Sequence, residues 1–405
     1  MRRPTLAAAL GVPAVLTVLV ATLPAAAAPA PAPDPLPGGS GLQQAELVGR
    51  AALPALTFGE PIPSGAAATA ANGVTPPFPA QPVQGFSGIL RDGDGWLVLS
   101  DNGYGTKANS ADYLLRVNRL AIDLVGGGVE VVGGFGLSDP DGHLPFPLTR
   151  PDRRLTGADL DPESFQRLPD GTFWFGEEFG PYLVHTDATG RVLEPPVRPE
   201  GVVSPDAPDL AGAVPTLASS KGFEGMALSP DGRTLYPLLE GAVSGDEPQT
   251  LRLYSFDTRR SDVTGVEARY RLESPGNAIG DLVALDDHRF LVIERDNGQG
   301  ATARFKAVFL FDTRDRDRDG FADKQLLVNL LAIPDPQGLA GEPGGFATFP
   351  FVTIEQLAVV DDHRILVGND NNFPGSNGRT PGVPDDDEYV LIEVDQDLDP
   401  RTPRR

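Results

Sequence analysis

The chain has 405 residues, no cysteine and a formal net charge of −23 from 56 acidic and 33 basic side chains. The absence of cysteine excludes disulfides and cysteine chemistry, so the fold must rest on its hydrophobic core. The negative charge disfavours nucleic acid and anionic membranes as partners and suits a protein that binds cations, although surface solvation alone also explains it.

Residues 1–28 have the pattern of a secretory signal peptide. Arg2 and Arg3 precede an apolar run that ends in small residues suited to cleavage. An uncleaved membrane anchor is the alternative, but Pro13 and the short apolar core make a poor spanning helix. We therefore expect a secreted or extracytoplasmic protein without stable membrane insertion after signal cleavage.

The remaining sequence predicts one folded domain with short flanking segments. Residues 29–42 are rich in alanine and proline and are typical of a linker. The folded domain is expected over residues 43–396, and residues 397–405 are expected to form a disordered tail. We expect the protein to be a monomer.

Internal repeats define the fold class. Short apolar runs separated by Asp-Gly, Asn-Gly and proline-rich turns indicate an all-β protein. Five segments share a template of strand, polar turn and apolar strand, and they begin at Phe86, Pro162, Phe223, Ile279 and Ile354. The intervals of 56 to 76 residues between them each accommodate four antiparallel strands. The sequence therefore predicts a single-domain β-propeller of five to six blades with four antiparallel strands each.

Two further expectations concern the completeness of the ring. The segment from Ala45 to Ala51 is predicted to supply the outermost strand of the last blade and so close the ring. A sixth blade, if present, would lie around residues 120–150 or 195–220, where the pattern is weak.

Acidic residues recur at both ends of the repeated hairpins. The opening positions hold Ser87, Glu163, Glu224, Gly280 and Glu355, with Asp281 next to Gly280. The closing pairs read Asp101-Asn102, Glu177-Glu178, Leu239-Glu240, Glu294-Arg295 and Asn369-Asp370. Because the start of one strand lies beside the end of the next in a hairpin, these acids are expected at one end of a central pocket. Salt bridges between blades are the alternative interpretation of the same residues.

The acidic ring predicts roles for two sets of side chains. Candidate catalytic residues, which would hold cations or position water, are Glu163, Glu177, Glu224, Glu294 and Glu355. Candidate substrate-binding residues are Lys221, Arg295, Asp101, Asn102, Asn369 and Asp370. Lys221 and Arg295 would bind a phosphate group, and a structural salt bridge is an equally good interpretation of each.

A separate calcium site is predicted in residues 315–323, which fit the pattern D-x-D-x-D-G-x-x-D. Alternate aspartates present oxygens to one side and the glycine allows the tight bend. The expected ligands are the side chains of Asp315, Asp317, Asp319 and Asp323 and the backbone carbonyl of Phe321. Leu326 replaces the glutamate that an EF-hand requires, so the loop resembles the shorter calcium hairpins of integrin-type propellers. A solvated loop neutralised by its own arginines is the alternative.

The sequence lacks the motifs of several common catalytic mechanisms. No G-x-S-x-G nucleophile elbow is present, and four histidines, two of them in equivalent turns, do not suggest a zinc site. Carboxylates, bound cations and a few basic residues remain. Such a set suits metal-assisted hydrolysis of phosphate esters.

Four motifs resemble those of the phytase-like family, also called "esterase-like activity of phytase" proteins. They are Gly157-Ala-Asp-Leu-Asp-Pro-Glu-Ser-Phe, Gly176-Glu-Glu-Phe-Gly-Pro-Tyr-Leu, Lys221-Gly-Phe-Glu-Gly-Met-Ala and Ile293-Glu-Arg-Asp. The resemblance extends over about residues 46–395 and implies an exported β-propeller that hydrolyses phosphoesters. Related β-propeller phytases use several calcium ions to bind phosphate, but their basic phosphate clamp has no residue-by-residue match here.

The leading hypothesis is an exported, calcium-dependent hydrolase acting on a small phosphorylated substrate. A lactonase-like propeller is a second hypothesis. It requires a single metal in the channel, held by Glu together with Asn or Asp. A non-catalytic propeller that binds a ligand or protein on its acidic face is a third, in which the acids would be tied up in salt bridges between blades.

Overall fold

The computed structural model describes residues 45–398, whose regular elements are strands apart from one 3-10 turn, η1 (Gly300–Thr302). The predicted signal peptide (1–28) and linker (29–42), and most of the predicted tail (397–405), lie outside the described residues. No helix in the described part of the chain is long and apolar enough to cross a membrane.

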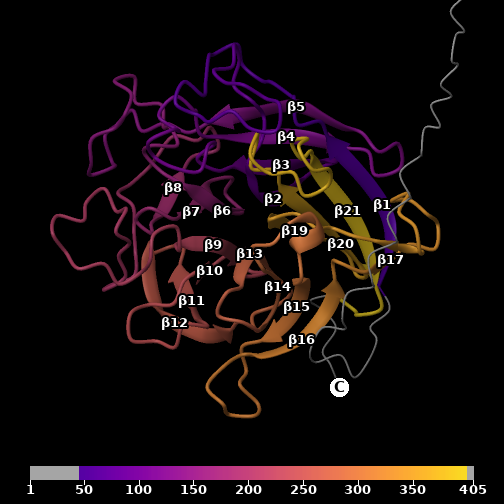
Figure 1. The fold of residues 1–405 in the computed structure, drawn as a ribbon. Helices are drawn as coiled ribbons and strands as arrows, with labels where there is room; N and C mark the ends of the chain where they lie inside the picture. The colour runs from indigo at the N-terminus through magenta and orange to yellow at the C-terminus, as the bar shows by residue number, and fades with distance from the viewer. Residues whose placement is uncertain (1–44, 399–405) are drawn as a thin grey trace, which may run out of the picture. The chain divides into compact units, whose positions relative to one another are not determined.

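Five antiparallel sheets surround a central axis as the blades of a propeller (Figure 1). The first blade consists of β2 (Phe86–Asp92), β3 (Gly95–Ser100), β4 (Arg116–Ile122) and β5 (Val129–Gly136). The second consists of β6 (Pro162–Arg167), β7 (Phe173–Glu177) and β8 (Leu183–Thr186). The third consists of β9 (Phe223–Leu228), β10 (Thr234–Leu239), β11 (Thr250–Asp257) and β12 (Asp262–Arg271).

The last two blades complete the ring. The fourth consists of β13 (Ala278–Ala284), β14 (Arg289–Arg295), β15 (Lys306–Asp312) and β16 (Asp323–Asn329). The fifth consists of β19 (Thr353–Asp361), β20 (Arg364–Asp370), β21 (Asp387–Val394) and β1 (Ala45–Leu53). Between these two blades, β17 (Ile333–Pro334) and β18 (Phe346–Ala347) form a short pair. The innermost strands β2, β6, β9, β13 and β19 contact one another in this order around the axis.

The predicted ring closure is confirmed by the pairing of the two ends of the described chain. Strand β1 pairs antiparallel with β21 over its whole length, from Ala45 opposite Val394 to Leu53 opposite Asp387. In Figure 1 the indigo strand β1 lies beside the yellow strand β21. The fifth blade therefore combines three strands from the end of the domain with one from its beginning.

The second blade differs from the predicted four strands. Its outer edge is the irregular segment 192–197, which makes isolated bridges from Val192 to Thr186 and from Val197 to Leu183. Prolines at 195 and 196 lack the N–H that a regular ladder needs. No sixth blade is present among residues 45–398, because 129–136 form β5 and 195–220 form loops.

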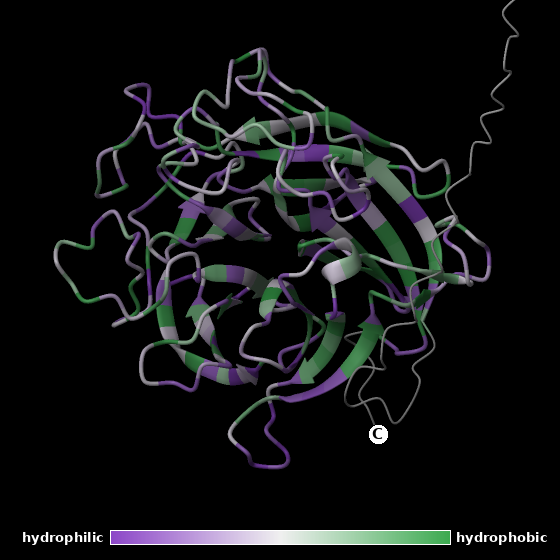
Figure 2. Cartoon of the chain, viewed as in Figure 1, coloured by the Kyte–Doolittle hydropathy of each residue, from purple (hydrophilic) through white to green (hydrophobic). Residues whose placement is uncertain are grey.

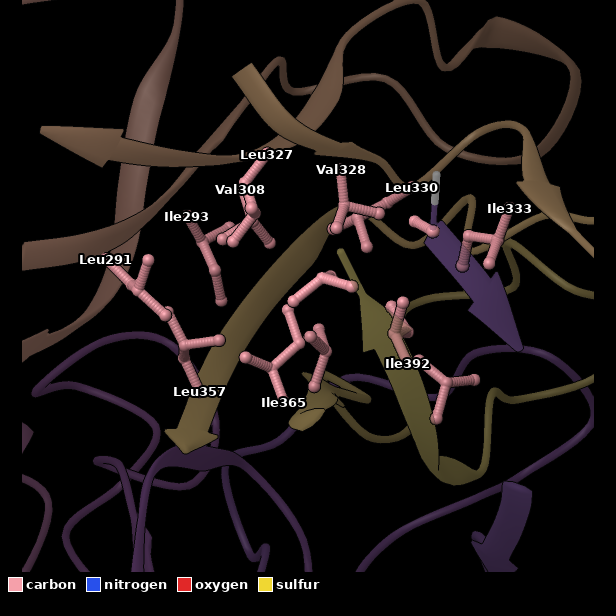
Figure 3. Packing of buried hydrophobic residues seen from close by; sticks show 14 of the residues in the cluster. Leu291, Ile293, Val308, Leu327, Val328, Leu330, Ile333, Leu357, Ile365 and Ile392 are labelled. Atoms are coloured by element: carbon pink, nitrogen blue, oxygen red, sulfur yellow. The ribbon is translucent and has the colours of Figure 1, made fainter. Parts of the chain in front are cut away.

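The hydrophobic core lies between the blades. Hydrophobic residues concentrate on the strands, whereas the loop between β15 and β16 is hydrophilic (Figure 2). In the largest cluster, Ile293 and Val308 of the fourth blade face Leu357 and Ile365 of the fifth (Figure 3). Burying each such side chain stabilises the fold by about 1.5–3 kcal/mol relative to exposure. These contacts hold the inner strands at a fixed spacing around the axis.

Gly280 tests how closely the inner strands approach. A Cβ atom on Gly280 would lie 2.2 Å from the carbonyl oxygen of Ile354 in the neighbouring blade. We expect Gly280→Ala to lower the free energy of unfolding by about 1–3 kcal/mol or more, because the two backbones must separate. Denaturant unfolding measures this loss. Gly133→Ala in β5 is the control, because a Cβ there meets nothing within 4 Å; equal losses in both variants would contradict the close approach.

Candidate active site

The residue that opens each inner hairpin lies in a β-bulge. The pairing between the first two strands of every blade skips these positions, which are Ser87, Glu163, Glu224, Gly280 with Asp281, and Glu355. A bulge leaves its extra residue unpaired and re-aims the side chain. As a result Glu163, Glu224 and Glu355 all line one pocket at the axis of the ring.

The closing pairs of the hairpins divide their side chains between two directions. The second member of each pair lines the pocket, namely Asn102, Glu178, Glu240, Arg295 and Asp370. Apart from Asp101, which also reaches the pocket, the first members are fully buried away from it, namely Glu177, Leu239, Glu294 and Asn369. Successive side chains of an extended segment point to opposite sides, so neighbours in sequence are separated in this way.

The pocket has a volume of about 260 Å³ and is strongly acidic. Eight carboxyl groups face only two basic side chains there, Lys221 and Arg295. The carboxyl groups belong to Asp101, Asp161, Glu163, Glu178, Glu224, Glu240, Glu355 and Asp370. The remaining lining residues are Asn102, Gly105, Ser220, Asn297, Val352, Thr353 and Asn372, so most of the metal-ligating side-chain atoms in the pocket are oxygens.

Three overlapping triads of carboxylates form the centre of the pocket. In each triad, one oxygen from every member lies within 4.8 Å of the others. The triads share Glu163, Glu178 and Glu224, so neighbouring triads have a carboxylate in common. Their members are Asp161, Glu163 and Glu178; Glu163, Glu224 and Glu355; and Glu178, Glu224 and Glu240. Oxygen donors at such spacing are typical of hard cations such as calcium.

Burial and mutual repulsion disfavour ionisation of these acids. Burial is the largest cause that raises the pKa of Glu163, Glu178 and Glu224, and neighbouring carboxyl groups raise it further. The pKa of Asp370 rises to about 7 for the same reasons, with Glu355 as its most effective neighbour. Both effects favour the protonated forms of these acids, and a bound cation would favour their ionised forms.

Two basic side chains offset part of the negative charge. A terminal nitrogen of the Arg295 guanidinium lies 3.1 Å from Glu355, 3.6 Å from Glu240 and 3.9 Å from Glu224. The Arg295 side chain is buried, whereas Lys221 is 37% exposed and its ammonium lies 2.5 Å from Glu240. The triad of Asp161, Glu163 and Glu178 makes no salt bridge with any described residue.

Three residues predicted for the site lie away from the pocket. Glu177 accepts hydrogen bonds from the backbone amides of Phe179, Gly180 and Tyr182 and so holds the following turn. Glu294 accepts bonds from the Tyr270 hydroxyl and the Lys324 ammonium inside the fourth blade.

Asn369 is the third of these residues. Its side-chain oxygen accepts a bond from the Glu388 amide, and its nitrogen donates to the Asp386 carbonyl. Asn369, Glu177 and Glu294 therefore have structural partners and take no part in the chemistry proposed below.

The structure places in the pocket three acids to which the sequence assigned no catalytic or binding role, and one of them, Asp161, was not predicted there at all. Glu178 and Glu240 belong to closing pairs that the repeats reveal, and their second position in each pair is the signal that identifies them. Asp161 lies one residue before β6 and accepts bonds from the backbone and side-chain amides of Asn102. Asp281, by contrast, accepts amides of Leu282 and Leu357 and does not line the pocket.

The predicted calcium loop connects β15 and β16 on the outer side of the fourth blade. Oxygens of Asp315, Asp317 and Asp323 lie within 4.8 Å of one another. One oxygen of Asp315 is buried without a partner, and the other accepts the Gly320 amide at 2.9 Å. The three aspartates form an oxygen donor set that fits calcium.

Asp319 does not join this group of aspartates. It pairs with Arg271 at 2.8 Å, and the Arg271 guanidinium lies 3.6 Å from the centre of the Phe321 ring.

The fold and the pocket together define a five-bladed β-propeller with an acidic, oxygen-lined centre suited to cations. The chain belongs to the phytase-like family described as "Esterase-like activity of phytase", whose profile matches residues 81–373. The resemblance inferred from the motifs is thereby confirmed, and the family match suggests a propeller hydrolase.

Individual relatives are more distant. An uncharacterized secreted protein of Arthroderma benhamiae is 25% identical over 190 residues, which cover 36% of this chain and 36% of that relative. An exo-β-1,3-galactanase from Clostridium thermocellum has 10% identity and a TM-score of 0.45, covering 80% of this chain and 65% of the galactanase. A Bacillus subtilis arabinanase has 12% identity and a TM-score of 0.39, covering 77% of this chain and 94% of the arabinanase. Structural likeness at this level carries no argument about function.

The raised pKa values predict an unusual pH dependence of stability. The folded-state pKa values of Asp370 and Glu177, each about 7, exceed their ordinary values of 3.8 and 4.5. The protonated forms of these two groups contribute their full share to the free energy of unfolding below about pH 4. This contribution is lost as the pH rises through about 7. In a chelator, the melting temperature should therefore fall from pH 5 to pH 8. Added calcium should reduce this fall, and a chelated protein with an unchanged or rising melting temperature would contradict the prediction.

The 315–323 loop predicts a calcium-dependent melting temperature. Calcium at about 100 times its dissociation constant stabilises a folded protein by roughly 2.7 kcal/mol through one site. We expect chelation to lower the melting temperature, and Asp315→Asn with Asp323→Asn to abolish the part of this shift that the loop contributes. Thermal scans with calcium and with a chelator measure it. Asp262→Asn, at an exposed aspartate of β12, is the control and should keep the full shift; an undiminished shift in the loop variant would refute the site.

Proposed function

We propose that this chain is an exported, calcium-dependent hydrolase of phosphate esters that acts in the central pocket. The observation that supports this most is the set of three overlapping carboxylate triads. Shared carboxylates allow neighbouring cations to be held close together, and one phosphate group can then contact more than one of them. The acidic pocket would otherwise repel an anionic substrate.

The residues of the pocket divide into cation holders and phosphate binders. Glu163, Glu224 and Glu355 would hold calcium with the other triad members. When bound, calcium supplies positive charge that polarises phosphoryl oxygens and favours ionisation of an attacking water. Carboxylates left without a cation would orient that water by accepting its hydrogen bonds.

Lys221 and Arg295 would bind the phosphate group in different ways. Lys221 is the more exposed of the two, and its flexible ammonium can leave Glu240 to meet an incoming phosphate. Arg295 is buried between Glu224, Glu240 and Glu355 and donates to the side-chain oxygen of Asn297. Its first role is to position these carboxylates, and its planar guanidinium can also present donors to phosphate.

Two observations favour this function over the alternatives. The three carboxylate triads could hold more than one cation, whereas the lactonase-like hypothesis requires a single metal in the channel. The non-catalytic hypothesis expects the acids to be consumed by salt bridges, but Asp161, Glu163 and Glu178 have none with a described residue. Export rests on the basic and apolar pattern of residues 1–28 and on the secreted relative.

Hydrolysis assays test the proposed function. The full chain should hydrolyse at least one substrate in a panel of phosphomonoesters and phosphodiesters, and activity should vanish on chelation and return with calcium. Glu224→Gln and Glu355→Gln should each lower kcat/KM by about 100-fold or more, because each removes a carboxylate that would hold the calcium whose positive charge stabilises the transition state. Glu393→Gln, at an exposed position of β21, is the control and should leave activity unchanged.

The substrate panel also contains lactones and so separates the hypotheses. Turnover of lactones alone would replace the phosphoesterase with the lactonase-like enzyme. No turnover of any substrate by folded protein with calcium would reject both enzymes. Turnover unaffected by Glu224→Gln and Glu355→Gln would remove the pocket from the mechanism.

A further inference from the structure

A buried lysine, Lys306, lies beside the pocket where the fourth blade meets the fifth. Its side chain is fully buried, and it is not among the residues that line the pocket. An ammonium group has three hydrogen-bond donors. Three oxygens surround this one, namely the backbone carbonyls of Asp296 at 2.7 Å and Val352 at 3.1 Å and the carboxylate of Asp296 at 3.1 Å. The oxygens match the donors in number, and the side chain is held in one position.

The three oxygens belong to two segments that line the pocket. Asp296 lies between Arg295 and Asn297, which both line the pocket. The Arg295 guanidinium donates to the side-chain oxygen of Asn297 at 2.7 Å. Val352 also lines the pocket and directly precedes β19. The Lys306 ammonium therefore joins the segment that follows β14 to the segment that precedes β19.

These contacts close a ring of interactions around Arg295. A terminal nitrogen of its guanidinium donates to Glu355 of β19 at 3.1 Å. On one side Lys306 holds Asp296, the neighbour of Arg295, and on the other it holds Val352 at the start of β19. Loss of the ammonium group would release both segments, so Arg295 and Glu355 could shift relative to each other.

Lys306 and Arg295 also act on each other through their charges. They lie directly opposite each other in the pairing of β14 with β15, so their side chains leave the same face of the sheet. Burial lowers the pKa of Lys306 to about 8, and Asp296 opposes this effect while the charge of Arg295 adds to it. Like charges in this arrangement repel. The repulsion favours positions of the Arg295 guanidinium nearer to the carboxylates of the pocket.

Stability alone does not explain a charged pair at this place. Burying the charges of Lys306 and Asp296 costs hydration, and replacing a whole buried ion pair by apolar side chains is often neutral or stabilising. The pair does, however, fix the backbone on both sides of the contact between Arg295 and Glu355. A role in arranging the pocket therefore accounts for it better than a role in the core.

We propose that Lys306 is a positioning residue that holds Arg295 and Glu355 in the arrangement in which Arg295 can donate to a phosphate group. It acts through Arg295, since it does not itself line the pocket. The part of this inference that concerns phosphate rests on the proposed function. The part that concerns the position of the Arg295 guanidinium does not.

A double-mutant cycle in the full chain tests this role, with inorganic phosphate in excess calcium as the probe. Lys306→Met and Arg295→Gln should each raise the dissociation constant of phosphate by about tenfold, and the double variant should also raise it by only about tenfold. The two effects overlap because Lys306 acts through Arg295. Isothermal titration calorimetry measures the four dissociation constants.

Lys324→Met is the matched control. Lys324 is another largely buried lysine of the fourth blade, and its ammonium contacts the carboxylate of Glu294 at 2.9 Å and the carbonyl of Arg271 at 2.6 Å. Glu294 is the other neighbour of Arg295 in sequence, but none of these three residues lines the central pocket. Both lysine variants should lower the melting temperature, because each leaves a buried carboxylate without its partner. Only Lys306→Met should weaken phosphate binding.

The outcomes separate this role from the proposed function. Additive losses in the double variant, or an equal loss of phosphate binding in Lys324→Met, would overturn the role of Lys306 and leave the proposed function standing. A wild-type protein that binds no phosphate in calcium also rejects the role. Overlapping losses of phosphate binding in a protein that hydrolyses no phosphate ester would support the role and reject only the proposed function.

A second variant keeps the test decisive if Lys306→Met does not fold. Asp296→Asn removes the carboxylate charge from the Lys306 ammonium and leaves both carbonyls in place, so it can replace Lys306→Met in the same cycle. A crystal structure of either variant should show the Arg295 guanidinium displaced from Glu355. A guanidinium in its wild-type position, with phosphate binding unchanged, rejects the role.

Discussion

The structure depends on one electrostatic constraint, which is the convergence of eight carboxyl groups on a pocket with two basic side chains. Five bulges at equivalent positions open the inner strands, and three of them carry the glutamates that meet at the axis. Like charges at such spacing repel strongly unless protons, arginines or cations reduce the charge. The scaffold must therefore be rigid enough to hold groups that would otherwise separate.

The rigidity comes from packing that is independent of the pocket. The largest hydrophobic cluster joins the fourth and fifth blades and includes Ala45 and Leu47 of β1, so the core and the ring closure are one structure. Gly280 allows β13 to approach the backbone of Ile354 in the next blade. Its lack of a side chain also explains why the fourth blade contributes no opening acid to the pocket, although Asp281 follows directly. That carboxylate is held by the amides of Leu282 and Leu357.

The repeats predicted the five blades and the common end of the acids, because both follow from hairpin pairing that recurs along the chain. They did not distinguish Glu177 from Glu178, since both are acidic and both are buried. Which of the two side chains faces the axis depends on the alternation of side chains along the strand. The bulge shifts this alternation by one residue, and no particular residue type marks the shift in the sequence. The three amides of the turn at Phe179–Tyr182 bind Glu177, and only the folded turn brings them together. The spacing of the repeats predicted four strands in the second blade. The prolines at 195 and 196 prevent its outermost segment from forming a regular strand.

The positions of the acids that lack a salt bridge are more informative than the overall excess of acidic residues. An exposed carboxylate is satisfied by water, so the net charge of −23 does not in itself require cations. Asp161, Glu163 and Glu178 in the pocket are buried, and none of them has a salt bridge within the described structure. Water cannot solvate these groups fully, and no lysine or arginine of residues 45–398 lies within salt-bridge distance of them. A bound cation would satisfy the oxygens of these acids, which are the ligand type that calcium prefers.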